Sequence, residues 1–553
     1  MSEIAIRGGT VIDGTGADGY AADVLVRDGR IADIGQGLSA DRTLDASGCV
    51  VTPGFIDIHT HYDAQVFWDP ALTPSCFHGV TTVVAGNCGF SVAPTRPEHR
   101  ETIALTLEKV EDMNPATLGA GIPWDFETFP EYLASVARRG TVLNYAAYVG
   151  HTALRLYHMG DDAYEREATK EEVDAMARSV REAMEAGAAG LATSFAPTHV
   201  GMGGKPVCSR LGGPEEFLPL AMELGKFGRG VIESTLGAGF AFDEVYDFQR
   251  RVGVPITYTA LLANPGLWEH GSKVHAEQRS QGTGVWPQIS CRTITLQVQL
   301  KAPFPFDSAA CFAELYAEAP EVREQRYRDP AWRARALREL EDTALTTKWE
   351  HFELAESEVH KDLIDRRLVD IAKERGISPL DAMIELSLDE QLETRFRYVQ
   401  ANYDAVGVEH LLNQEQMALG LSDAGAHVGM LCDAPLPTDL LGRWVRERGA
   451  IPLEKAVHKL TGEPASIFRF RDRGILREGA HADVCVFDPA RVAPGPIRRV
   501  RDFPADAERL TADAPQGIQH VLVNGVPIHV DGESRATHME ERPGVRPVQD
   551  AHA

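Results

Sequence analysis

The strongest chemical signal in the sequence is a pair of histidines, His59 and His61, at the end of the apolar run 54–58. Side chains two residues apart on a β-strand point to the same face, so this pair would present two imidazoles side by side. A bare His-x-His arises often by chance, and isolated histidines usually make structural hydrogen bonds. Here, however, the pair ends an apolar run that Pro53 and Gly54 introduce. The pattern therefore predicts the first two ligands of a divalent metal.

Asp423 is the second signal, because it ends the apolar run that starts at residue 419. In a parallel α/β barrel, a carboxylate at the carboxyl end of a strand lies on the catalytic face. There it can bind a metal and accept a proton from the water that the metal activates. An aspartate that only caps the following helix is the structural alternative. His427, four residues later, fits a substrate contact and a structural hydrogen bond equally well.

Cys88 is the third candidate and follows the apolar run 81–85. Gly86 and Gly89 on either side of it allow the backbone to approach another group closely. A thiolate in such a place suits zinc, because sulfur is a soft ligand. Buried cysteines are also common as small apolar residues, so spacing alone leaves both interpretations open.

These residues need a scaffold that brings strand ends together, and the apolar runs predict one. Eight candidate strands are separated mostly by helical stretches, which favours an α/β fold with a TIM-like (β/α)8 barrel over residues 54–470. The candidate strands are residues 54–59, 81–85, 142–149, 190–194, 230–234, 255–259, 293–298 and 419–423. The charged, helical segment 321–392 is too long for an ordinary connection, and we expect it to be an insertion before the last strand.

Both ends of the chain are rich in short strands. Turn pairs such as Gly8-Gly9 and Asn524-Gly525 separate alternating apolar runs. We therefore expect residues 1–53 and 471–540 to form one small β-sandwich domain together. Residues 541–553 have the composition of a loosely held tail.

The composition narrows the class of protein. The chain has 553 residues, a net charge of -26 and a pI of about 5.2, which disfavours a nucleic-acid-binding surface. Eight scattered cysteines without a CxxC pair indicate reduced thiols. Neither a secretory leader nor an apolar run of about 18 residues is visible, so we expect a cytoplasmic enzyme without a membrane span. Walker, Rossmann and Gly-x-Ser-x-Gly motifs are also missing.

With these residues identified, the chain resembles the amidohydrolase superfamily and, within it, the N-acyl-D-amino-acid deacylase (D-aminoacylase) branch. The resemblance lies in residues 50–61, 79–89, 149–151, 421–427, 443–446, 472–474 and 482–483. It implies a distorted barrel with a small β-sandwich, zinc, and hydrolysis of a C–N amide bond in a small molecule, an N-acyl amino acid. It further implies that Cys88 is a metal ligand beside the two histidines and Asp423. Asp423 would carry a proton from water to the leaving nitrogen.

The sequence departs from this branch at the second metal. The resemblance predicts a histidine at the end of the fifth strand and another at the end of the sixth, but segments 230–236 and 255–261 contain none. The fourth strand, within 190–195, has no lysine for a carbamate bridge. Residues that could bind a second metal, contact the substrate or only shape the pocket are Glu233, His151, His199, Tyr258 and His427. We therefore predict one tightly bound ion, zinc, per chain.

Other functions stay open at this point. A hydrolase of a cyclic amide, a lactone or an ester would use the same metal residues, and the missing histidines leave room for a lyase or isomerase on the same barrel. A catalytically inactive binding subunit is a further alternative, which the joint retention of His59, His61 and Asp423 disfavours. The sequence leaves the acyl group, the stereochemistry and the oligomeric state open, and it is compatible with a homo-oligomer.

Overall fold

Eight parallel strands form the centre of the fold in the computed structural model, which describes residues 3–201, 205–303, 306, 309–318, 320–342 and 348–551. The strands pair in the order β16, β12, β11, β10, β9, β8, β7, β6. A parallel bridge between Thr60 and Ala424 joins the segments that follow the first and last strands. The predicted TIM-like barrel is confirmed. Its strands are β6 (Phe55–Asp57), β7 (Val80–Ala85), β8 (Asn144–Gly150), β9 (Gly190–Ser194), β10 (Val231–Thr235), β11 (Ile256–Thr259), β12 (Val285–Ile289) and β16 (Ala418–Leu419).

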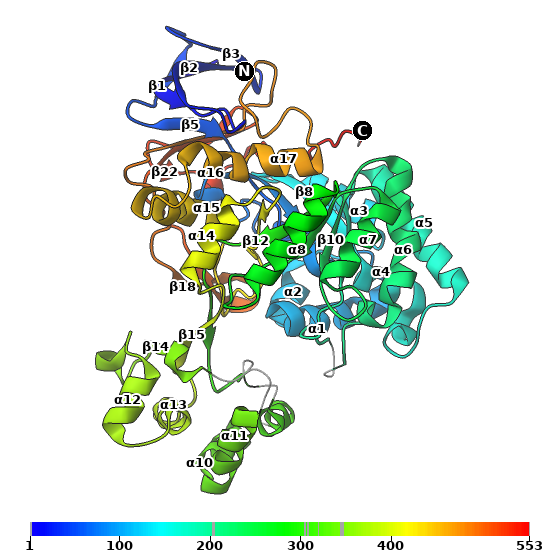
Figure 1. Ribbon diagram of the computed structural model, residues 1–553, viewed down its shortest axis with the longest axis vertical. Coiled ribbons are helices and arrows are strands. Elements are labelled where there is room, and N and C mark those ends of the chain that lie inside the picture. Colours follow the sequence, from blue (N-terminus) through cyan, green and yellow to red (C-terminus); the bar gives the residue numbers. More distant parts are fainter. Residues whose placement is uncertain are drawn as a thin grey trace. The chain divides into compact units, whose positions relative to one another are not determined.

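Helices lie around these strands (Figure 1). Their sequences carry clear end signals: α3 begins with a capping box of Thr128 and Glu131, and α5 begins with one of Thr169 and Glu172. Gly187 ends α5 in the left-handed conformation that glycine adopts without strain. The helices are α1 (Arg100–Glu111), α2 (Pro115–Gly121), α3 (Phe129–Arg139), α4 (His151–Met159), α5 (Lys170–Ala186), α6 (Ser209–Phe227), α7 (Phe242–Val252), α8 (Trp268–Ser280), α14 (Ala405–Asn413), α15 (Leu436–Asp439), the π-helix η11 (Leu440–Glu447), α16 (Leu453–Leu460) and α17 (Gly462–Phe468).

The prediction of a barrel strand at residues 293–298 is wrong. Strand β12 takes that place and pairs with β11 and β16. Pro287 lies inside it, and proline is seldom found in a central strand, so the pattern did not identify it. Residues Ile294–Val298 form β13, which pairs only with antiparallel strands. The last barrel strand is also shorter than predicted, so Asp423 lies in the loop beyond it.

The strand-rich ends of the chain, for which the sequence predicts a small β-sandwich, pair with each other in one nine-stranded sheet. Strand β5 pairs with β1 on one side and with β17 on the other, which joins the N-terminal strands to the C-terminal ones. Buried apolar side chains from both ends, such as Ile6, Val51 and Leu522, pack together. The strands are β1 (Ile4–Val11), β2 (Tyr20–Arg27), β3 (Arg30–Gly35), β4 (Arg42–Asp45), β5 (Val50–Pro53), β17 (Val484–Phe487), β20 (Ile518–Val523), β21 (Val526–Val530) and β22 (Glu533–Ser534), with a separate hairpin of β18 (Arg498–Phe503) and β19 (Ala507–Thr511).

Residues Thr293–Tyr403 form a compact unit of their own, and the rest of the chain forms the other unit. The predicted helical insertion, 321–392, covers only part of this unit, which also contains a three-stranded antiparallel sheet in the order β13, β15, β14. The rings of Phe352 and Tyr398 stack across this sheet. Residues 343–347 of the predicted insertion lie outside the described residues. The elements are β13 (Ile294–Val298), α9 (Ala310–Ala313), α10 (Pro320–Arg328), α11 (Pro330–Asp342), β14 (Phe352–Glu356), α12 (Leu368–Arg375), α13 (Pro379–Leu388) and β15 (Arg395–Ala401).

The C-terminal tail is not the loosely held end that its composition predicts. The amide of Tyr145 donates to the carbonyl of Val545 at 3.1 Å. The side-chain amide of Gln549 donates to the carbonyls of Ala189 and Phe468, at 3.2 Å and 3.1 Å. This segment is held by hydrogen bonds rather than by burial of apolar side chains. Because composition does not reveal such hydrogen bonds, the prediction failed here. Residues 552–553 of the tail lie outside the described residues.

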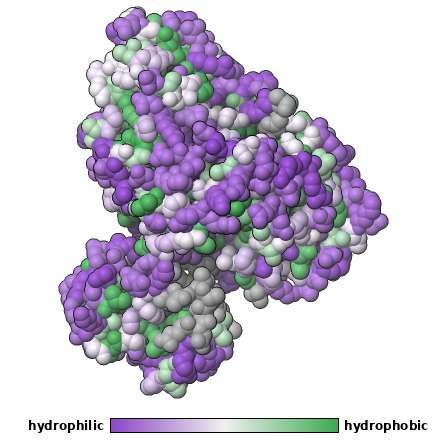
Figure 2. Space-filling view, in the orientation of Figure 1, coloured by the Kyte–Doolittle hydropathy of each residue, from purple (hydrophilic) through white to green (hydrophobic). Residues whose placement is uncertain are grey.

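The face seen in Figure 2 is mainly hydrophilic, in keeping with the net charge of -26. Large apolar side chains that stay exposed, such as Leu267 and Val406, lie in different elements. No helix among the described residues is both long and apolar enough to cross a bilayer.

Replacing Gln549 by alanine is expected to lower the thermal unfolding temperature. The change removes the side-chain donor from the buried carbonyl of Phe468, which costs about 1–3 kcal/mol for a buried polar group, whereas the carbonyl of Ala189 still accepts the amide of Val231. Scanning fluorimetry of Gln549→Ala measures the effect, and Val548→Ala, at a side chain that is 56% exposed, is the matched control. Equal unfolding temperatures in both variants and the wild type would show that the tail contributes no stability.

Candidate metal centre

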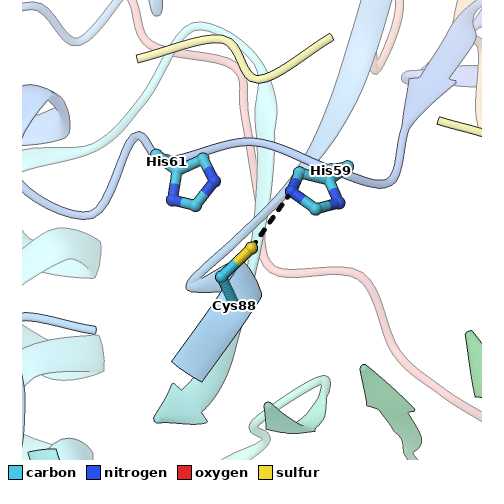
Figure 3. Close-up of side chains that lie close together, drawn as sticks. All are labelled: His59, His61 and Cys88. Carbon is cyan, nitrogen blue, oxygen red and sulfur yellow. Dashed lines mark hydrogen bonds between the residues drawn. The ribbon is translucent and has the colours of Figure 1, made fainter. Parts of the chain in front are cut away.

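Three side chains that could bind one metal ion meet at the carboxyl ends of the first two barrel strands (Figure 3). His59 and His61 follow β6, and Cys88 follows β7. Their candidate ligand atoms all lie within 4.8 Å of one another, and all three residues are buried. The Sγ of Cys88 is 3.7 Å from Nε2 of His59. Imidazole nitrogen and thiolate sulfur are the ligands that zinc prefers.

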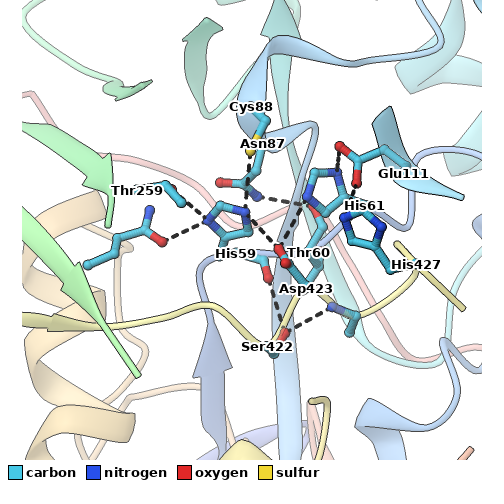
Figure 4. A network of polar contacts seen from close by, with 12 residues as sticks. His59, Thr60, His61, Asn87, Cys88, Glu111, Thr259, Ser422, Asp423 and His427 are labelled. Atoms are coloured by element: carbon cyan, nitrogen blue, oxygen red, sulfur yellow. Dashed lines mark hydrogen bonds and ion pairs between the residues drawn. The ribbon is translucent and has the colours of Figure 1, made fainter. Parts of the chain in front are cut away.

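Asp423 approaches the two imidazoles from the loop after β16 (Figure 4). Its Oδ1 lies 3.1 Å from Nε2 of His59 and 3.5 Å from Nε2 of His61. The same ring nitrogen of each histidine therefore faces the carboxylate. Residues from the first, second and last strands thus converge on one point of the catalytic face.

The loop that carries Asp423 has an unusual backbone. Leu421, Asp423 and His427 have φ angles of 62°, 47° and 49°, and Gly425 has 95°. Positive φ is uncommon outside glycine, and such strain persists where the surrounding structure fixes the backbone. Part of that restraint comes from the hydroxyl of Ser422, which donates to the carbonyl of His59 at 3.0 Å.

Gln288 and Thr259 support His59 from behind. The Oε1 of Gln288 is 2.7 Å from Nδ1 of His59, and the hydroxyl of Thr259 is 3.3 Å from the same nitrogen. The amide of Gln288 donates to Thr257, which fixes its oxygen toward the histidine. An acceptor at Nδ1 keeps the proton there and leaves Nε2 free for a metal. Sequence reasoning missed Gln288 because it missed strand β12.

Glu111 is a second residue that sequence reasoning missed. It ends α1, and its buried carboxylate lies 3.4 Å from Nδ1 of His61 and 3.6 Å from Nε2 of His427. Its backbone carbonyl also accepts the amide of His427. The surrounding sequence is that of an ordinary charged helix. The one signal is that Glu111 lies on the apolar face of this helix, with Ala104 and Leu107. The carboxylate thus faces, at ion-pair distance, the ring nitrogen of His61 that points away from Asp423.

Two of the predicted contact residues point away from the cluster. The ring nitrogens of His151 contact Thr193 and Glu216, each at 2.9 Å, so both are occupied. Tyr258 lies between Thr257 and Thr259 on β11, whose hydroxyls contact Gln288 and Glu233 inside the barrel. Because side chains alternate along a strand, Tyr258 points outward and packs against Phe242. Neither residue joins the candidate site.

His199 and His427 lie closer to the site. Nδ1 of His199 is 2.6 Å from the hydroxyl of Ser194, and its ring packs edge-on against Phe90. Burial, with His427 and His61 nearby, lowers the pKa of His199 to about 3, so it is neutral. Residues 202–204, which follow His199 in the chain, lie outside the described residues.

The imidazoles and Asp423 shift one another's pKa values. Burial disfavours the cation of His59, but the hydrogen bond and charge of Asp423 outweigh it and raise the pKa of His59 to about 9. At His61 burial dominates and lowers the pKa to about 4, despite Asp423. Burial also disfavours the anion of Asp423, yet the hydrogen bonds from both histidines hold its pKa well below its usual value. Asp423 is therefore ionised.

At the other acidic groups of the site, burial outweighs the positive charge that nearby histidines supply. Burial, and then repulsion by Glu233, Glu111 and Asp423, raises the pKa of the Cys88 thiol well above its usual value. Burial raises the pKa of Glu233 to about 7, and burial followed by the charge of Asp423 raises that of Glu111 well above its usual value. A dication would favour the anionic form of each group. The donor set therefore fits a divalent metal, and its thiol and imidazoles fit zinc.

A cavity of about 400 Å³ borders the loop that follows Asp423. It is bounded by α1 and α2, the loop after Asp423, and the hairpin of β18 and β19. Its walls include the apolar side chains of Trp68, Met113, Leu118 and Phe503. None of the three clustered ligand residues lines it.

Comparison with known proteins assigns the family. The model of the amidohydrolase family matches residues 42–529. The chain belongs to this family. A D-aminoacylase of Alcaligenes xylosoxydans xylosoxydans is 30% identical, over 95% of this chain and 94% of that protein. An N-acyl-D-glutamate deacylase of the same organism is 31% identical, over 95% of this chain and 93% of that protein. The resemblance to the D-aminoacylase branch is confirmed.

Solved structures agree with this assignment. An N-acyl-D-glutamate deacylase of Bordetella bronchiseptica, in complex with zinc and a phosphonate mimic of the tetrahedral intermediate, has a TM-score of 0.65 and 28% identity, over 100% of this chain and 99% of that one. A D-aminoacylase with a binuclear metal centre has a TM-score of 0.65 and 27% identity, over 98% of this chain and 99% of that one. In that enzyme one metal activates and the second attenuates.

Glu111→Gln is expected to weaken divalent metal binding by about 3- to 10-fold, less than the full effect of losing an orienting partner, because glutamine keeps an acceptor oxygen but loses the negative charge. Competition with a chromophoric chelator measures the affinity. Glu101→Gln, an exposed change at the start of the same helix, is the matched control. Equal affinities in the two variants would mean that Glu111 does not support His61.

Proposed function

We propose that the chain hydrolyses the amide bond of an N-acyl amino acid in a metal-dependent reaction. The meeting of His59, His61, Cys88 and Asp423 on the catalytic face of the barrel is the observation that carries the proposal. Similarity over 95% of the chain to a D-aminoacylase and an N-acyl-D-glutamate deacylase supports the substrate class. Because both relatives' names specify it, the D-enantiomer is the first to test.

In this proposal one zinc ion is held by the two histidines, Cys88 and Asp423. Zinc is supported by the thiol in the donor set and by the zinc complex of the related deacylase. One ion is supported by the lack of histidine at the ends of β10 and β11. When bound, a divalent metal polarises a carbonyl group and lowers the pKa of water.

Asp423 moves the proton in the proposed reaction. Its carboxylate is ionised and held against both imidazoles, so it accepts the proton of the attacking water and returns it to the leaving nitrogen. The other face of the carboxylate remains reachable, since its side chain is 24% exposed. His427, which is 22% exposed, is placed to contact the substrate. The eight free cysteines support a reducing compartment, which in this proposal is the cytoplasm.

Replacing both His59 and His61 by alanine should remove the metal and abolish hydrolysis, because two of the proposed ligands are lost. Elemental analysis of protein purified without added metal measures the content, and circular dichroism checks the fold. Wild-type protein should carry close to one zinc per chain. Full metal content in the double variant would refute the site.

Asp423→Asn keeps the shape of the side chain but removes its basicity. We expect turnover of N-acyl-D-amino acids to fall by at least about 100-fold, within the usual range for a general acid–base group, while metal is partly retained. Near-normal turnover in this variant would mean that another group handles the proton.

A substrate panel tests the reaction class. We expect the wild-type protein to release amino acids from N-acyl-D-amino acids faster than it opens cyclic amides, lactones or esters. Preference for one of the latter would replace the proposed function while leaving the metal centre intact.

A further inference from the structure

The ends of the fifth and sixth barrel strands still point to the metal centre, although they carry no histidine. Glu233 on β10 and Thr259 at the end of β11 face the interior of the barrel. The side chain of Glu233 is fully buried. A carboxylate in this place is either a ligand for a second ion or a support for the first.

The contacts of Glu233 distinguish these roles. Its Oε2 accepts the backbone amide of Cys88 at 2.6 Å, and its Oε1 accepts the hydroxyl of Thr259 at 2.9 Å. Each oxygen is therefore committed to a donor of the chain. The cluster of residues that could hold an ion, among those the structure describes, does not include Glu233.

The first of these bonds fixes a strained residue. Cys88 has a φ of 56° and a ψ of 8°, the left-handed conformation, between Gly86 and Gly89. A cysteine keeps this conformation only where its surroundings enforce it. Asn87, the residue before Cys88, is held by its own side-chain amide, which donates to the carbonyls of Thr60 and Val84. Glu233 holds Cys88 itself, so it sets the direction of the Sγ toward His59.

The second bond reaches His59. Thr259 has one hydroxyl proton, and it donates that proton to Glu233. The lone pairs of the hydroxyl are then left for Nδ1 of His59, 3.3 Å away. A proton on Nδ1 leaves Nε2 as the nitrogen that faces Cys88 and Asp423. One carboxylate thus connects two of the proposed ligands.

We propose that Glu233 is a positioning residue: it holds Cys88 and, through Thr259, His59 in the arrangement that binds one metal, and it is not a ligand of a second metal. This inference rests on the proposed function, in which both residues bind the ion. It assigns a structural task to a residue of the strand on which the family resemblance predicts a metal-binding histidine.

Cobalt(II) substitution tests the inference with readouts other than activity, because a cysteine ligand gives a thiolate-to-cobalt absorption band. We expect Glu233→Ala to weaken this band and to lower cobalt affinity by about 10- to 100-fold, as loss of an orienting partner does. Metal content at saturation should stay close to one ion per chain. Ser234→Ala, the next residue of the same buried strand with its side chain on the opposite face, should leave the band and the affinity unchanged.

Two gentler variants separate the two bonds. Glu233→Gln keeps an oxygen for the amide of Cys88 but turns an amide donor toward Thr259. Thr259→Val removes the hydroxyl and so deletes the same Glu233–Thr259 hydrogen bond. Both should keep the thiolate band and lose cobalt affinity to a similar degree, by about 3- to 10-fold, less than the full effect of an orienting partner. These variants decide the matter if the alanine variant does not fold.

Three results would overturn the inference. An unchanged band and affinity in Glu233→Ala would show that Cys88 needs no such support. Loss of the band in Glu233→Gln would show that the charge of Glu233 is required rather than its hydrogen bonds. Two metals in the wild type, with one lost in Glu233→Gln, would make Glu233 a ligand. A wild-type protein that binds no cobalt would instead refute the proposed metal centre itself, and the inference with it.

Discussion

Two hydrogen bonds close the barrel at its candidate metal centre. The hydroxyl of Ser422 donates to the carbonyl of His59, 363 positions away in the sequence, and the amide of His61 donates to the carbonyl of Ala424 at 2.7 Å. Strand β16 has only two residues, so the first and last strands are joined mainly by these contacts beyond its end. Any slip between the two segments would move Asp423 relative to both imidazoles. Closure of the fold and assembly of the site are therefore the same event.

This closure buries acidic groups that repel one another. Burial, and then the charges of three carboxylates, raises the pKa of the Cys88 thiol; these carboxylates are Glu233, Glu111 and Asp423. The positive charge near them comes from the histidines. Burying unpaired charge opposes folding, and proteins keep such clusters mainly where function needs them. The left-handed backbone of Cys88 and of the Asp423 loop opposes folding too. A bound dication would relieve the repulsion but not the backbone strain, which the surrounding hydrogen bonds must hold.

The sequence predicted the parts of the site whose signal is local. His59, His61 and Asp423 stand at the ends of apolar runs, and the barrel and the β domain follow from the run pattern and from the family resemblance. Gln288 and Glu111 could not be found this way. Gln288 lies in a strand hidden by Pro287, and Glu111 ends a helix of ordinary composition whose docking side is set only by the tertiary fold. The pairing of the tail could not be predicted either, because it joins backbone groups, which every sequence has, to one another and to the side-chain amide of Gln549.

The ends of the fifth and sixth strands show how such a site can change without losing its geometry. Strand alternation still directs Glu233 and Thr259 into the barrel, so whatever occupies these positions must interact with the centre. A threonine hydroxyl is a poor zinc ligand beside imidazole or thiolate, but it can accept a hydrogen bond from the back of His59. The carboxylate of Glu233 likewise uses one oxygen to accept the backbone amide of Cys88. Strands that supply no imidazole can thus restrain the ligands of the other strands. A centre with few ligands needs such restraint more, because each ligand fixes a larger share of the coordination geometry.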